Sequence, residues 1–376
     1  MAASRFVMLR SALPRPLHPF AWWGYAIGLA VAASSTTNPL LLAGLIGAAI
    51  VVAMSRRGSN PWANSFALYL WLAVFIVVLR VGFRILFGGG DGPTVLLTLP
   101  EMPLPSWVRG IRLLGPVSLE AVLAGLYDGL RLATIVVCIG AANSLANPKK
   151  LLASLPAALY ELGTIMVVAV SALPQLGESL QRVVRARRLR RGSAARSRRD
   201  RLRAVETIIV PVLSDALERS LALAASMDVR GYGRSGSGGR RRTLALGLGA
   251  IGLLTVWAFR FLAGSPDVRL AGVPIVSVAL AAAGLGCGVA ALRVAGRSVR
   301  RTQYRPIRWR WPETLTVLCG ATAVLLVTAV AEPTVVFPAI SPFAWPSLTG
   351  PLLLALAAAV LPATLTPPPS MPKVAP

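Results

Sequence analysis

The sequence has few of the residues that catalytic and metal sites need. It contains one histidine, His18, and three cysteines, Cys138, Cys287 and Cys319, each inside an apolar run. One histidine excludes a His-based metal cluster and a catalytic triad. Cysteines so far apart match neither a zinc-binding spacing nor a disulfide framework. We therefore expect no metal site and no cofactor, and we interpret the cysteines as small buried hydrophobic residues.

Charged residues are also scarce. They make up 14% of the 376 residues, whereas hydrophobic residues make up 55%. Soluble domains carry about 25% charged residues, so this composition excludes an ordinary soluble enzyme, and its hydrophobicity excludes a disordered chain. Of the 53 charged residues, 39 are Lys or Arg, and only three of these are lysine. The sequence predicts a membrane protein with anionic partners such as lipid headgroups.

Eight stretches are long and apolar enough, or nearly so, to cross a membrane as helices of about 20 residues. They are residues 20–36, 39–54, 65–87, 118–142, 243–263, 271–294, 313–331 and 348–365. Residues 88–117 are rich in Gly and Pro and predict a loop, with room for a short re-entrant or interfacial helix. The fold class that follows is all-α: a polytopic membrane protein with about eight transmembrane helices.

The distribution of basic residues predicts the orientation. With the N-terminus inside, cytoplasmic segments hold 32 of the 39 Lys and Arg residues, as the positive-inside rule requires. We expect both termini and residues 147–242 to be cytoplasmic, in a bacterial plasma membrane. Arg80, Arg84 and Arg131 lie inside spans, where they either contact a partner subunit or reach the membrane surface. Asp128 is three residues from Arg131, a spacing that suits a local ion pair, and a transport role is the alternative.

Residues 147–242 interrupt the membrane pattern. Leu151–Leu173 is nearly apolar and is either a ninth span or an amphipathic helix at the inner membrane surface. We favour the second interpretation, because a ninth span would move the arginines of residues 293–310 outside. A helix over Pro174–Arg191 follows, with Glu178 and Arg182 at an ion-pairing spacing.

A second amphipathic helix is predicted over residues 205–229, with Asp215 and Arg219 as another spaced pair. Its apolar face holds Ile209, Leu213, Ala216, Ser220, Leu223 and Met227. Both helices end in arginine triplets, Ala186-Arg187-Arg188 and Val229-Arg230-Gly231. An arginine at a helix tip can make a bidentate contact with a carboxylate. The insert therefore predicts a docking device for a soluble partner with an acidic groove. Nucleic acid is not expected as a partner, since no aromatic residues interleave the basic run.

At these residues the chain resembles the transmembrane T component of energy-coupling factor (ECF) transporters, which includes the cobalt-type permease subunits. The resemblance covers about residues 15–265. It is carried by Leu17-His18-Pro19, Asn38-Pro39-Leu40, Gly129-Leu130-Arg131-Leu132, Asn147-Pro148, Ala225–Gly233 and the two triplets. The family's triplets read Ala-Arg-Gly, so Arg188 and Val229 are departures and the central arginines Arg187 and Arg230 carry the match.

The resemblance implies a non-catalytic coupling subunit. It implies two cytoplasmic ATPase subunits docked on the triplets, and a membrane S component that binds a vitamin or transition-metal ion. Consistent with that division, the chain lacks the G-x-x-x-x-G-K-[ST] phosphate loop. The rival interpretations are a stand-alone permease, a membrane-anchored regulator that binds an acidic protein, and a membrane enzyme acting on lipid, for which the chain offers no acidic or histidine cluster.

The expected division of the chain follows the spans. We expect N-terminal transmembrane helices in 1–146, the coupling-helix region in 147–242 and a helix completing the family core in 243–265. Additional C-terminal helices, without an assigned role, are expected in 266–366, followed by a disordered tail in 367–376.

Overall fold

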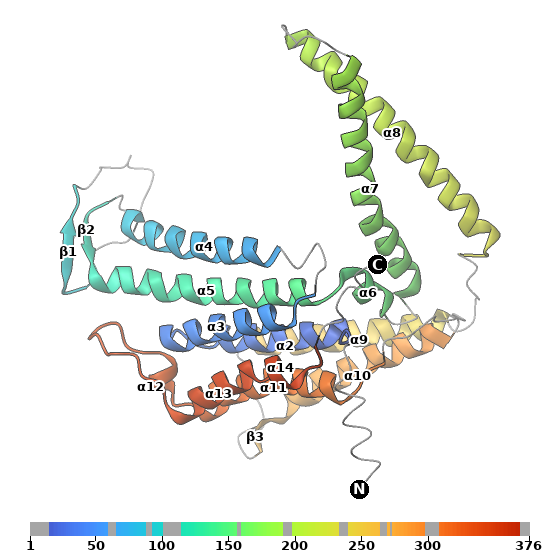
Figure 1. The fold of residues 1–376 in the computed structure, drawn as a ribbon. Coiled ribbons are helices and arrows are strands. Elements are labelled where there is room, and N and C mark those ends of the chain that lie inside the picture. Colours follow the sequence, from blue (N-terminus) through green and yellow to red (C-terminus); the bar gives the residue numbers. More distant parts are fainter. Residues whose placement is uncertain are drawn as a thin grey trace. The chain divides into compact units, whose positions relative to one another are not determined.

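A computed structural model describes residues 15–58, 65–87, 92–100, 114–155, 159–190, 198–232, 240–263, 269–270, 273–297 and 308–368. The chain forms two units, Met1–Leu151 with Pro306–Pro376, and Leu152–Arg305. The first unit holds α2 (Pro19–Ser34), α3 (Pro39–Arg56), α4 (Phe66–Phe87), β1 (Val95–Thr98), β2 (Pro116–Ser118), α5 (Leu119–Leu145), α11 (Trp311–Leu325), η3 (Leu326–Val330), α12 (Pro333–Val336), α13 (Gly350–Val360) and α14 (Pro362–Leu365). The second unit holds α7 (Tyr160–Arg190), α8 (Arg198–Val229), α9 (Arg240–Leu262), β3 (Arg269–Leu270), β4 (Val273–Pro274) and α10 (Ile275–Arg297). The short α6 (Pro148–Ala153) spans the boundary (Figure 1).

The described residues confirm an all-α polytopic membrane protein. Seven helices are long and apolar enough to cross a membrane. Two predicted spans are shorter than expected: α2 has 16 residues, and the last stretch, 350–365, is divided between α13 and α14. One of the seven, Leu162–Ala186 within α7, lies where we favoured an amphipathic helix; it is the least apolar of the set.

Three of the sequence motifs prove to be helix starts. His18, Asn38 and Asn147 each precede a proline and accept backbone N–H bonds from the first turn of α2, α3 and α6. Asn38 Oδ1, for example, lies 3.0 Å from the Leu40 nitrogen. A capping side chain followed by proline fixes the start of a helix, since proline has no N–H to leave unpaired. His18 is therefore a capping residue.

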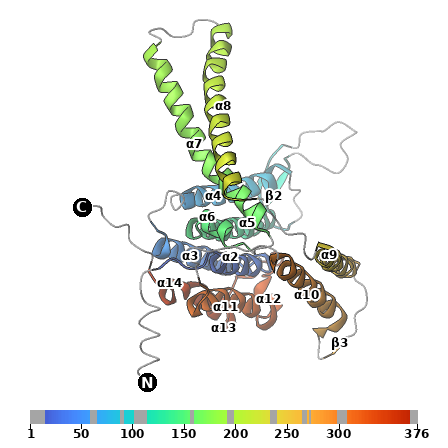
Figure 2. The ribbon, with the colours of Figure 1, turned by 90° about the vertical axis from the view of Figure 1, so that its right-hand side faces the viewer.

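The first unit is built around α5 and the hairpin of α2 and α3. Helix α2 lies between α5 and α11, α3 packs on α5 and α13, and α4 packs along α5 (Figure 2). The core holds Tyr25, Leu29, Leu41, Leu45 and Leu352, all almost completely buried. The Tyr25 hydroxyl donates a hydrogen bond to the Ala359 carbonyl at 2.5 Å, so the C-terminal segment supplies the hydrogen-bond partner of this buried tyrosine.

The C-terminal segment closes the bundle through polar contacts as well. The Asn38 amide donates to the carbonyls of Val335 and Ser347, both at 2.9 Å. At the other end of α3, Arg56 Nε donates to the Ala363 carbonyl at 2.9 Å. These bonds satisfy carbonyls that would otherwise be orphaned in an apolar surrounding. Residues 308–368 are thus structural parts of the same bundle as α2 and α3.

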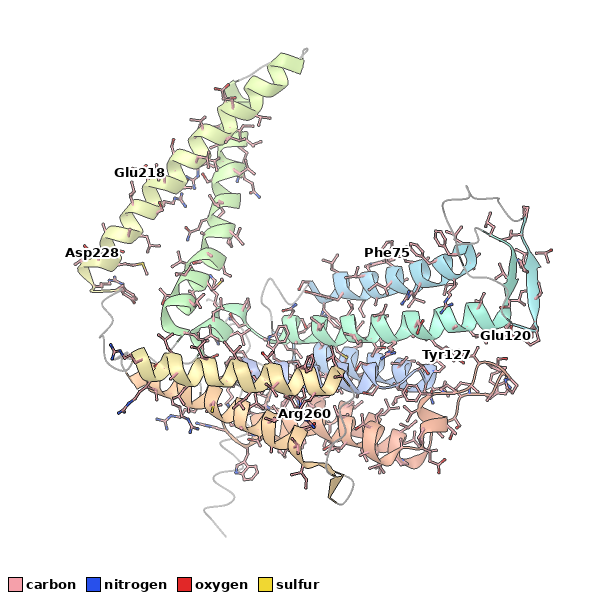
Figure 3. The ribbon with its side chains drawn as sticks, turned by 180° about the vertical axis from the view of Figure 1, so that it is seen from behind. Phe75, Glu120, Tyr127, Glu218, Asp228 and Arg260 are labelled. Atoms are coloured by element: carbon pink, nitrogen blue, oxygen red, sulfur yellow. The ribbon has the colours of Figure 1, made fainter. Side chains whose placement is uncertain are left out.

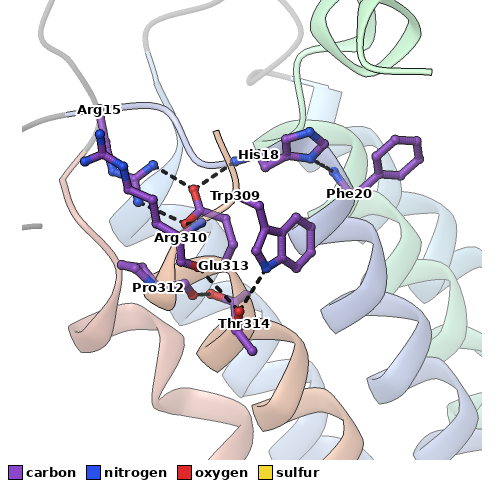
Figure 4. Close-up of polar contacts among 9 residues, drawn as sticks. Arg15, His18, Phe20, Trp309, Arg310, Pro312, Glu313 and Thr314 are labelled. Atoms are coloured by element: carbon purple, nitrogen blue, oxygen red, sulfur yellow. Dashed lines mark hydrogen bonds and ion pairs between the residues drawn. The ribbon is translucent and has the colours of Figure 1, made fainter. Parts of the chain in front are cut away.

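An ion pair fastens the segment before α2 to the start of α11 (Figure 4). Arg15 makes two bonds to the Glu313 carboxylate, at 2.7 and 2.9 Å. The same carboxylate accepts from the backbone N–H groups of Arg310 and His18, and it is completely buried. A buried carboxylate is tolerated when it is paired and hydrogen-bonded in this way.

Helices α2 and α11 touch through glycine. A Cβ on Gly28 would lie 2.7 Å from the carbonyl carbon of Gly320, closer than any real contact. Only glycine permits this approach of two backbones.

The loop after α4 contains strands. Val95–Thr98 pairs antiparallel with Pro116–Ser118, and Thr94 donates to Glu120 at 2.8 Å. We allowed for a short helix in this loop; its described residues form a hairpin, as the Val- and Leu-rich sequence of β1 favours. Residues 101–113 lie outside the described part.

Candidate functional site

The basic insert folds as two long helices, α7 and α8, which run in opposite directions and contact each other at an angle (Figures 1 and 2). The expected break at Pro174 was wrong: α7 continues through it from Tyr160 to Arg190. Proline inside a helix removes one backbone bond and crowds the preceding turn. Here the helix continues through Pro174, which is exposed, as are the residues beside it.

A polar clamp joins the two helices. The Ser179 hydroxyl, which is 3% exposed, donates to Asp215 Oδ2 at 2.6 Å. Arg219 binds the same carboxylate, with Nε 3.1 Å from Oδ1, so the predicted Asp215–Arg219 pair is confirmed. The predicted Glu178–Arg182 pair does not form; Arg182 lies instead where its charge acts on Asp215. The clamp therefore places a carboxylate among two arginines and a serine.

These contacts lower the pKa of Asp215, first through the Ser179 hydrogen bond and then through the charges of Arg219 and Arg182. A carboxyl whose pKa is lowered in the folded state adds stability above its unfolded pKa and loses it as pH falls through the folded value. The clamp is therefore intact at neutral pH and fails only in acid.

Replacing Ser179 with alanine should loosen α7 from α8. The carboxylate loses its interhelical donor, so hydrogen exchange of the amides of α8 around Asp215 should become faster. Ser171→Ala is the matched control, because the Ser171 hydroxyl bonds only the Val167 and Val168 carbonyls of its own helix. Equal rates of hydrogen exchange in the two variants would show that the Ser179–Asp215 contact does not hold α7 against α8.

Helix α8 keeps an apolar surface free. Ile209 and Leu213, which we assigned to its apolar face, are about half exposed, and so are Leu217 and Leu221. These four residues, the α8 row, are spaced by four and form one stripe along the helix. The sequence analysis assigned Ile209 and Leu213 to the apolar face of this helix. It did not assign Leu217 and Leu221, because α8 has apolar residues on several sides. Figure 3 labels Glu218 and Asp228 on the same helix.

The second triplet ends α8 with a defined cap. Gly231 has a φ of +73°, its N–H bonds the Asp228 carbonyl at 2.9 Å, and the Tyr232 N–H bonds the Met227 carbonyl at 3.1 Å. This pair of bonds is the Schellman motif, which requires a left-handed residue and so favours glycine. The glycine stops the helix and leaves Arg230 as the exposed residue at its tip. Val229 beside it is 89% exposed.

The first triplet lies differently. Ala186-Arg187-Arg188 belongs to α7, and the helix continues past it to Arg190 instead of ending there. Arg188 stands where a capping glycine would stop the helix, and α7 continues past it to Arg190. Ala186 is exposed, and the side chains of Arg187 and Arg188 lie outside the described part. Because α7 and α8 run in opposite directions, the two triplets lie near opposite ends of the pair, on the order of 40 Å apart at 1.5 Å per residue.

The charges inside the spans pair differently from the prediction. Asp128 lies 3.8 Å from Arg84, on α4, and does not pair with Arg131. Arg131 donates instead to the carbonyl of Ser34 at the end of α2, where unpaired carbonyls attract a cation. Within the described part, no three His, Cys, Asp or Glu side chains gather in a cluster that could hold a metal ion.

The model of the cobalt transport protein family, CbiQ, matches residues 15–240 of the chain. The chain belongs to this family. The match includes α2 to α8 and both triplets, and it ends where α9 begins. Helices α10 to α14 of this CbiQ-family chain therefore lie outside the matched region, although α11 and α13 pack on α2 and α3.

Three curated proteins similar to this CbiQ-family chain are each described as energy-coupling factor transporter transmembrane protein EcfT. The protein from Macrococcus caseolyticus is 36% identical over 104 residues, which is 27% of this chain and 37% of the relative. That from Leuconostoc gelidum subsp. gasicomitatum is 28% identical over 195 residues, 46% of this chain and 71% of the relative. The protein from Thermotoga maritima is 27% identical over 181 residues, which is 44% of this chain and 66% of the relative. The chain thus spans little more than a third of the first relative's length.

Proposed function

We propose that this chain is the coupling subunit of an ECF-type importer. It transmits the motion of two cytoplasmic ATPases to a membrane S component that binds the substrate. One observation carries the proposal: α7 and α8 present arginine triplets near opposite ends, with Arg230 exposed on a capped helix tip. Two sites about 40 Å apart suit two partner subunits better than one.

The arginines at the ends of α7 and α8 determine how the chain would dock on the ATPases. A guanidinium at a helix end can make two parallel bonds to a carboxylate in a groove of the ATPase. The clamp of Ser179 and Asp215 holds the two helices together, so movement of one tip is passed to the other. The α8 row then offers an apolar surface through which that movement reaches a membrane partner.

The orientation belongs to the same proposal. With both termini and residues 147–242 in the cytoplasm, the ATPases meet the triplets, and 32 of the 39 basic residues lie inside. A membrane crossing by α7 would place the arginines of residues 293–310 outside, so we keep α7 at the inner surface. Anionic lipid headgroups are further partners there.

The chain itself is non-catalytic in this proposal. It has no phosphate loop for ATP, and substrate specificity resides in the S component. The substrate class is a vitamin or a transition-metal ion; the family's description favours cobalt, which would be cargo of the complex.

Purification of the chain from its own cells in mild detergent tests the proposal. Mass spectrometry should find ATPase subunits with the wild type and none with the Arg187→Ala/Arg230→Ala variant. Arg241→Ala/Arg242→Ala is the matched control, because it removes the same charge from two exposed arginines at the start of α9. Absence of ATPases from the wild type would favour a stand-alone permease or a membrane-anchored regulator.

A further inference from the structure

One side of the α4–α5 pair is open within the first unit. The two helices approach closely because Gly129 and Gly140 face α4; a Cβ on Gly140 would lie 2.5 Å from the Tyr69 ring. Ala49 and Ala53 of α3 cover one side of the pair, against Leu70 and Val77. The other side exposes apolar side chains that are each 38–49% exposed: Leu72, Leu79 and Phe83 of α4, and Leu132 and Ile139 of α5.

Unbalanced charge lies in the middle of this open side. The Asp128 carboxylate lies 3.8 Å from the Arg84 guanidinium, and Arg131 donates a hydrogen bond to the Ser34 carbonyl. Arg80 emerges beside Gly129, is exposed, and has no carboxylate of the described residues within ion-pair distance. Two arginines and one carboxylate therefore lie at this seam, and Asp128 pairs with Arg84 and not with Arg80.

The charges lie at membrane depth. Arg80 is seven residues before the end of α4 at Phe87, about 10 Å along the helix axis. Asp128 is nine residues after the start of α5 at Leu119, about 13 Å. An unpaired arginine inside a span is costly and normally faces a partner or water. Helices α11 and α13 pack on α2 and α3, whereas the α4–α5 side offers both an open apolar face and an unpaired charge.

We propose that this surface, the Arg80 surface, binds a transmembrane helix of the S component that carries a carboxylate level with Arg80. The inference rests on the proposed function, which supplies that partner. The partner's Asp or Glu completes the charge balance of Arg80, Arg84 and Asp128, and its apolar residues pack between Leu79, Phe83 and Leu132. In the low dielectric of the bilayer, such a pair fixes both the register and the choice of partner helix.

A photo-reactive benzoylphenylalanine at Leu79, in membranes that contain the whole complex, tests this inference. Irradiation should cross-link Leu79 to a transmembrane peptide of a membrane subunit that contains Asp or Glu. The same probe at Val74, which is 55% exposed and lies about 140° around α4 from Leu79, is the matched control and should capture no subunit. Arg80→Gln should lower the Leu79 yield roughly tenfold, as loss of one charge-assisted contact implies, whereas Arg80→Lys should keep most of it. Arg80→Glu combined with arginine at the partner's carboxylate should restore it.

Three results would overturn the inference. They are a Leu79 product that contains only lipid, equal capture from Val74, and an Arg80→Gln yield equal to the wild type. If ATPases and a membrane subunit still co-purify while Leu79 captures nothing, the proposed function stands and the Arg80 surface does not. If neither co-purifies, the proposed function fails and takes this inference with it.

Discussion

Replacing Arg230 with alanine should lower substrate uptake strongly without preventing membrane insertion. Arg230 ends α8 as an exposed side chain on a Schellman cap, so its loss leaves the fold unchanged and removes a docking contact. A hydrogen bond to a charged group contributes about 1.5–3 kcal/mol, which corresponds to roughly tenfold to hundredfold weaker docking. Uptake by cells that express the variant at the wild-type level measures the effect.

Variants of Gly231 separate the cap from the charge. Gly231→Val keeps Arg230 but forces a β-branched residue into a φ of +73°, so the tip should shift and uptake should fall. Gly231→Asn should retain most uptake, because asparagine tolerates the left-handed region. Uptake that is unchanged in both Arg230→Ala and Gly231→Val would mean that this helix end docks nothing.

The second large effect is expected at the Arg15–Glu313 pair. Arg15→Met leaves a fully buried carboxylate without its cation. Breaking a buried pair in this way costs about 3–5 kcal/mol. The melting temperature of the purified protein in detergent should fall by about 5 °C, and α11 should detach first from the segment before α2.

The double variant Arg15→Met/Glu313→Met is the control for that pair. It removes both charges together, so most of the lost stability should return, apart from the hydrogen bonds that Glu313 accepts from the backbone N–H groups of Arg310 and His18. A double variant as unstable as Arg15→Met would show that the damage comes from packing and not from the unpaired carboxylate.

Much of the fold could be predicted from the sequence, because apolar runs of span length and capping residues are local signals. His18-Pro19 and Asn38-Pro39 fix the starts of α2 and α3 within a few residues. The pairing of Asp215 with Arg219 also follows from spacing alone. The exposed tip at Arg230 was predicted as a triplet, and the structure adds the reason for its glycine.

Other features depend on contacts between distant segments, which no local pattern records. Nothing near Asn38 predicts that its amide binds Val335 and Ser347, which lie 297 and 309 residues away. The sequence predicted a break at Pro174, but α7 continues through it. Asp128 has Arg131 at a favourable spacing and still pairs with Arg84, because close glycine packing brings α4 against α5.

The central claim is that the two ends of the α7–α8 pair dock on two different ATPase subunits. Photo-reactive side chains at Ala186 and Val229, both exposed and next to the arginines, test it in the intact complex. The account predicts that each position alone captures one ATPase, and that a chain with both probes captures two. Capture of a single ATPase by both probes together, or of lipid alone at either position, would contradict it.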